Sequence, residues 1–88
     1  MNKTQQIIAD YYALSPKEKA VAVYEFHKEK MKEKRIPVPG HLDVGAWSIE
    51  DTAKEFHIAT SMVSLFFTQI GKSAKKAREE VNGTTEGE

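Results

Sequence analysis

The sequence predicts an all-α fold of four to five helices around a tri-helical core, with no sheet. Three observations support this class. Apolar residues recur at helical spacing, helix-start signals occur at Ser15 and Ser48, and no segment alternates apolar and polar residues as a half-buried strand would. With 88 residues, 40% of them hydrophobic and 30% charged, the composition is that of one small globular domain, expected over residues 1–81.

Two helices are predicted in the first half of the chain. The first covers residues 3–13, where apolar and aromatic side chains share one face: Ile7, Ile8, Tyr11 and Tyr12. The second begins at Ser15-Pro16-Lys17-Glu18 and runs to about Lys34. The serine caps the helix, proline fits its first turn, and Glu18 completes a capping box.

Residues 35–47 interrupt the helical pattern. Pro37, Pro39-Gly40 and Gly45 exclude a continuous helix and predict a tight turn near residues 38–41. A plain loop is favoured here, with a short irregular hairpin as the alternative.

Three further helical segments follow. Ser48 caps the first, which carries Glu50 and Asp51 where acidic groups suit the helix dipole. A break at His57-Ile58 precedes a helix over about residues 60–70, ended by Gly71, and another helix is expected over residues 73–81. The acidic tail, residues 82–88, has no apolar side chain to bury and is predicted to be disordered.

Residues 49–68 have the pattern of a helix-turn-helix. Ala53 provides the small residue that two closely crossing helices need, and His57 occupies the turn position where glycine is usual. Either Thr60 or Ser61 is expected to cap the second helix. The apolar positions before and after the turn are Phe56, Ile58, Val63 and Phe66. An ordinary helical hairpin remains the alternative.

The order of these segments also resembles a known family. The central DNA-binding region of ParB/KorB-type partition proteins, and of small phage and plasmid regulators, looks similar to three segments taken in order: Leu14-Ser-Pro-Lys-Glu-Lys-Ala20, Ser48–Phe56 and Ser61-Met-Val-Ser64. The similarity covers about residues 14–70. It implies that the second helix of the motif enters the major groove of DNA, through Thr60, Ser61, Ser64, Leu65 and Thr68. The matched region does not include the nucleotide-binding domain that ParB proteins carry. The resemblance therefore supports DNA binding and does not support a role as a partition clamp.

The charge distribution gives this reading partial support. Basic and acidic residues both number 13, so the formal net charge is zero. Basic residues nevertheless cluster at positions 28–35 and 72–78, and local patches suffice for phosphate contacts. The expected phosphate ligands are Lys54, Lys72, Lys75, Lys76 and Arg78. The later cluster is equally compatible with an ordinary solvated helix face.

The expected DNA-reading helix carries few base readers. No Arg, Lys, Asn or Gln precedes Gln69 on it, and Leu65 or Phe67 must face outward because Val63 and Phe66 face inward. A second hypothesis follows, in which the fold binds a protein through Leu65 and Phe67, for instance as a phage-encoded modulator of a host factor.

Other classes of function have weaker support. Cysteine is absent, the three histidines are too widely spaced for a metal motif, and no nucleophile, phosphate loop or cofactor signature occurs, so no enzyme, cofactor or metal is expected. Without a signal or membrane segment, the expected location is the cytoplasm. The expected partners are double-stranded DNA and a second copy of the chain, because one small module binds DNA weakly.

Overall fold

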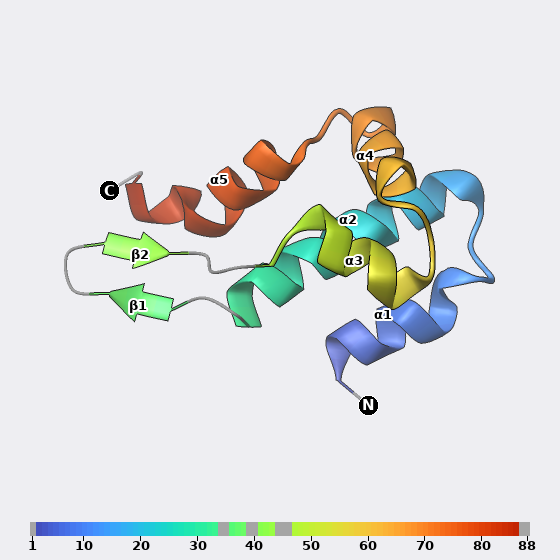
Figure 1. Cartoon of the computed structure of the whole chain (residues 1–88), viewed down its shortest axis with the longest axis horizontal. Coiled ribbons are helices and arrows are strands. Elements are labelled where there is room, and N and C mark those ends of the chain that lie inside the picture. The colour runs from blue at the N-terminus through green and yellow to red at the C-terminus, as the bar shows by residue number, and fades with distance from the viewer. Residues whose placement is uncertain (1, 34–35, 39–40, 44–46, 87–88) are drawn as a thin grey trace.

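The computed structural model describes residues 2–33, 36–38, 41–43 and 47–86, with side chains described over 2–33 and 47–81. Helices dominate this part of the chain, which confirms the all-α class. They are α1 (Lys3–Tyr11), α2 (Pro16–Glu33), α3 (Ile49–Phe56), α4 (Thr60–Gln69) and α5 (Ala74–Glu86). Figure 1 shows α2 in the middle of the molecule, and α1, α3, α4 and α5 all pack on it.

The expectation of no sheet was wrong. Strands β1 (Ile36–Val38) and β2 (His41–Asp43) form an antiparallel hairpin in which Pro37 pairs with Leu42. Antiparallel ladders alternate hydrogen-bonded and non-hydrogen-bonded pairs, so a proline in a short edge strand need not remove a ladder bond. The alternative of a short hairpin was therefore the better reading of this segment. Residues 39–40, where the turn was expected, lie outside the described residues.

The predicted helix starts at Ser15 and Ser48 are confirmed. The hydroxyl of Ser15 accepts the backbone N–H of Glu18 at 3.3 Å, and that of Ser48 accepts the N–H of Asp51 at 3.2 Å. Each carboxylate in turn accepts the backbone N–H of its serine at 3.0 Å. These reciprocal bonds satisfy N–H groups that have no partner inside the helix.

Helix α5 ends later than composition predicted. It continues to Glu86, five residues beyond the expected end at Val81. The disordered tail expected over 82–88 was therefore wrong for 82–86, and 87–88 lie outside the described residues. Extending an existing helix adds one backbone bond per residue without a new nucleation cost, and no proline stops it here.

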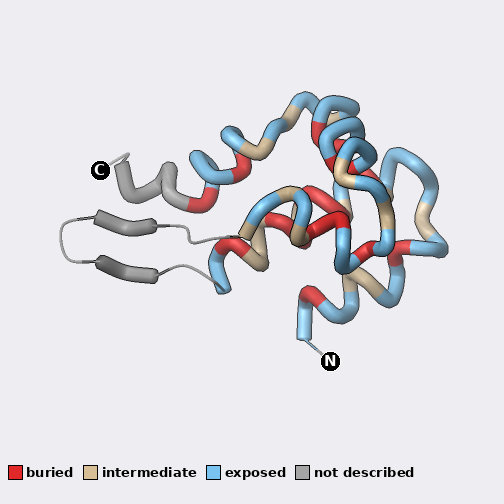
Figure 2. Tube along the Cα trace, in the orientation of Figure 1, coloured by how far each residue is buried: buried red, intermediate tan, exposed pale blue. Residues whose placement is uncertain are grey.

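The core lies between α2 and the helices around it. Figure 2 shows the buried segments turned inward, with exposed residues along the outer face of α4. Phe26 of α2 packs edge-on against Phe56 of α3, with ring centroids 4.8 Å apart, and Tyr24 of α2 packs against Phe67 of α4 at 5.1 Å. Tyr11 of α1 also contacts Phe56. These aromatic contacts fix α3 and α4 on α2 and so determine which face of α4 is left outside.

Candidate nucleic-acid interface

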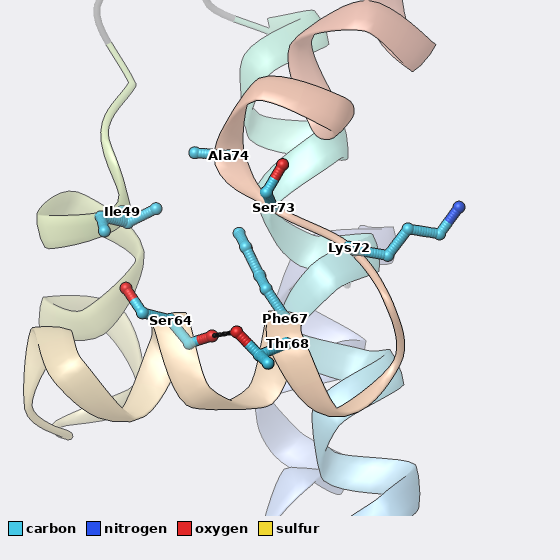
Figure 3. A pocket seen from close by; sticks show the side chains of 7 residues that line it. All are labelled: Ile49, Ser64, Phe67, Thr68, Lys72, Ser73 and Ala74. Atoms are coloured by element: carbon cyan, nitrogen blue, oxygen red, sulfur yellow. Dashed lines mark hydrogen bonds between the residues drawn. The ribbon is translucent and has the colours of Figure 1, made fainter.

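The turn between α3 and α4 has the geometry that the helix-turn-helix pattern predicts. His57 adopts a left-handed conformation (φ 58°, ψ 42°), as expected for the position where glycine is usual. Its N–H donates to the carbonyl of Lys54 at 3.2 Å, and the N–H of Ile58 donates to that of Ala53 at 3.1 Å. This pair of bonds is the Schellman motif, which ends α3 and redirects the chain. Ala53 is buried, and α4 crosses the axis of α3 steeply (Figure 3).

Helix α4 separates cleanly into an inner and an outer face. Val63, Phe66 and Phe67 are buried, whereas the outer side chains are exposed. The exposed positions are Ser61, Met62, Ser64, Leu65, Thr68 and Gln69, with Thr60 half-buried. Either Leu65 or Phe67 was expected to face outward, and Leu65 does. Phe67 does not: it is 1% exposed against Tyr24 and His27, so its assignment to a partner-binding surface was wrong.

The start of α4 also differs from expectation. Its N-cap residue is Ala59, which has no side-chain oxygen, so neither Thr60 nor Ser61 caps the helix. Thr68 donates its hydroxyl proton to the carbonyl of Ser64 at 3.0 Å. Its oxygen is left as a hydrogen-bond acceptor on the outer face.

A hollow of about 120 Å³ opens beside this outer face. It lies where the start of α3, the second half of α4 and the start of α5 meet. Figure 3 shows Phe67 rising between Ile49 and Ser73, with Ser64 and Thr68 at the near edge and Lys72 extending away. Side chains of three helices therefore line one small depression at the edge of the outer face.

Lys72 is engaged within the protein. Its ammonium lies 2.6 Å from one oxygen of Glu80, while Lys28 and the hydroxyl of Tyr24 donate to the other oxygen at 3.2 and 2.7 Å. These hydrogen bonds, that from Lys72 first, lower the pKa of Glu80 to about 2. The cluster ties α5 to α2, and the carboxylate of Glu80 neutralises part of the charge that Lys72 would offer to a phosphate.

The other residues of the two basic clusters, together with Lys54, lie on three helices, α2, α3 and α5, as far as the structure describes them. In the earlier cluster, Lys28, Lys30 and Lys32 each form an ion pair with a glutamate of α2, and 34–35 lie outside the described residues. Lys54 of α3 is exposed. So are three basic side chains on α5: Lys75, Lys76 and Arg78. The accessible positive charge near α4 is therefore smaller than the sequence alone suggests.

A buried polar network supports α3 from beneath and was not predicted. The Thr52 side-chain oxygen lies 2.7 Å from Nδ1 of His27 and 2.7 Å from Nε1 of Trp47. Trp47, partly buried just before α3, donates the second of these bonds from its indole N–H. Met62, exposed on the flank of α4, was missed as well. Residue 62 lies outside the apolar stripe at positions 63, 66 and 70 that faces the core, and this spacing could have predicted that Met62 is exposed.

Within residues 2–33 and 47–81, no three His, Asp or Glu side chains gather as metal ligands would. The side chains of His41 and Asp43 lie outside the described residues. Among the described helices, none is both long and apolar enough to cross a membrane. Comparisons with protein-family models, curated proteins and solved structures find no match to this chain.

Proposed function

We propose that this protein is a helix-turn-helix DNA-binding protein that inserts α4 into the major groove of double-stranded DNA. The observation that carries the proposal is the α3–α4 unit itself. Its left-handed turn at His57 and its buried Ala53 hold α4 with one whole face outward. An α-helix presented in this way fits the width of the major groove.

Charge around α4 is compatible with this role. Helix α4 carries no charged side chain, so no carboxylate on it repels the DNA backbone. Lys54, Lys75, Lys76 and Arg78 are exposed on the two adjoining helices and serve as phosphate ligands. With so few such ligands, a single copy binds weakly, and a dimer on two half-sites supplies the affinity of a small phage- or plasmid-type transcriptional regulator.

The test is selection from a pool of random duplexes at low and physiological salt, followed by titration of the selected site. The expected result is an enriched sequence whose affinity falls with salt. Replacing Lys76 by alanine is expected to reduce the slope of log affinity against log salt by about 0.9, the value for one lost phosphate contact. Lys17→Ala, at an exposed lysine at the start of α2, is the matched control and leaves the slope unchanged. Failure to select any sequence under either condition contradicts the proposal.

A second candidate function is a protein-interaction module on the same fold. It is favoured by the exposure of two large apolar side chains, Met62 at 40% and Leu65 at 49%, on an uncharged helix. Leu65→Asp distinguishes the two. If it abolishes self-association or capture of a protein partner in a chain that never binds DNA, the interaction module is the correct function.

A further inference from the structure

We infer that α4 selects its DNA site through the 5-methyl groups of thymine, with Leu65 as the central contact. The inference rests on the proposed function and adds to it the chemistry by which a base is chosen. Its starting point is the composition of the outer face over residues 60–68, which has hydroxyls and carbon where a DNA-reading helix more often has amides or guanidinium groups.

Leu65 is one of three residues on the outermost face of α4 and has the largest side chain of the three. Successive residues of a helix are separated by about 100° around its axis, so Ser61, Leu65 and Thr68 lie opposite the inner stripe. That inner stripe comprises Val63, Phe66, Phe67 and Ile70, of which the first three are buried. Leu65, flanked by two hydroxyl residues, is therefore the side chain that reaches deepest into a groove occupied by α4.

A leucine can distinguish base pairs in only one way. It has no hydrogen-bonding group, and the thymine methyl is the only apolar group that unmodified bases present in the major groove. Against a G·C pair, the same side chain would remove water from polar edges without replacing their hydrogen bonds. Leu65 thus favours T·A at the position it covers.

The neighbouring hydroxyls do not compete with this preference. Ser61 and Ser64 can donate or accept, so they accommodate either kind of base edge. Thr68 presents only its oxygen as an acceptor, because its proton is bonded to the carbonyl of Ser64. Within residues 60–68 no side chain can form the paired hydrogen bonds that identify guanine or adenine. Gln69, the last residue of α4, could do so, but the bases are contacted mainly by the N-terminal residues of a recognition helix, so Leu65 is the strongest discriminating contact within residues 60–68.

The experiment replaces each thymine of the selected site, one at a time, by deoxyuridine, which lacks the 5-methyl group but keeps the same hydrogen-bonding edge. Wild-type protein is expected to lose about fourfold in affinity at one thymine per half-site, the value of one buried methyl. Leu65→Ala protein is expected to bind thymine and uracil equally at that position. Met62→Ala, which shortens the other exposed apolar side chain of α4, is the matched control and retains the difference.

The outcomes separate this inference from the proposed function. Absence of binding to any duplex overturns both. Sequence-selective binding with equal affinity for thymine and uracil at every position overturns the thymine readout and leaves DNA binding intact. If Leu65→Ala instead dissociates a dimer in light scattering while the thymine–uracil difference persists, Leu65 belongs to a subunit interface and the inference is also overturned.

Discussion

In the core, Nδ1 of His27 lies 2.7 Å from the side-chain oxygen of Thr52. The same oxygen accepts the indole N–H of Trp47, which can only donate. The second lone pair and the hydroxyl proton of Thr52 both remain available, so His27 can donate to this oxygen or accept from it, according to its tautomer. Burial first, and the charge of Arg78 second, lower the pKa of His27 to about 4, while Asp51 acts in the opposite direction. A neutral histidine thus joins α2 to the first helix of the motif.

This relationship predicts that the free energy of unfolding falls as the pH is lowered from 6.5 towards 4. The unfolded chain binds a proton at the ordinary histidine pKa of 6.5, whereas folded His27 does not until about pH 4. Between pH 7.5 and 5.5 the loss is expected to be about 1 kcal/mol. Urea unfolding at several pH values measures it.

The control for this prediction is His27→Gln, which keeps a hydrogen-bond acceptor but cannot titrate. Most of the pH dependence between 7.5 and 5.5 should disappear in the variant. The carboxylates whose pKa values are lowered in the fold do not interfere in this range, because they titrate below it in both the folded and the unfolded chain: Glu18, Glu29, Asp51 and Glu80. A variant with an unchanged pH profile would show that His27 is not the titrating group.

Thr52→Val is expected to destabilise the fold by about 2–4 kcal/mol, because it leaves the buried ring nitrogen of His27 and the partly buried indole N–H of Trp47 without a partner. Thr52→Ser keeps the hydroxyl and loses only a buried methyl, so its cost should be about 1 kcal/mol. Denaturant unfolding followed by Trp47 fluorescence compares the two. Equal costs would mean that the hydrogen bonds contribute little.

His57→Gly should leave stability unchanged or raise it by up to about 1 kcal/mol, since glycine enters the left-handed region without steric cost. His57→Val should lower it by about 1–2 kcal/mol for the opposite reason. His57 is exposed, so neither change alters the core. Thermal unfolding monitored by circular dichroism gives the order, and a valine variant as stable as the wild type would contradict the observed turn.

Glu80→Gln is expected to loosen α5 and to strengthen DNA binding. The ion pairs with Lys28 and Lys72 are lost, at a cost of about 0.5–1 kcal/mol for such partly exposed groups. Amide hydrogen exchange in α5 should become faster, and the released Lys72 should steepen the salt dependence of DNA binding. Glu79→Gln, at the exposed neighbouring carboxylate, removes the same charge and should not change exchange in α5.

Local chemistry explains what the sequence could predict. The capping boxes at Ser15 and Ser48 and the turn at His57 each depend on residues within five positions of one another. Such signals are readable because the bonds they make are local. Helical periodicity narrowed the outward-facing residue of α4 to Leu65 or Phe67, and packing of Phe67 in the core decided between them.

Contacts between residues distant in the chain explain the features that the sequence could not predict. Phe67 lies near the edge of the inner stripe of α4, and only its packing on Tyr24 and His27 decides that it is buried. Lys72 resembles a phosphate ligand until Glu80, eight residues later, is found beside it. The hairpin was expected only as the less favoured alternative, because proline and glycine suit a loop as well as a turn.

The hairpin divides the chain into two halves that need each other. Before it come α1 and α2, and after it α3, α4 and α5. Phe26 and Tyr24 from the first half fill the core only with Phe56 and Phe67 from the second. A chain cut within the hairpin would therefore yield two fragments with complementary apolar faces, each a specific partner for the other and neither a complete domain. Mixing two separately expressed polypeptides would then assemble the domain that holds the helix-turn-helix and its outward-facing α4.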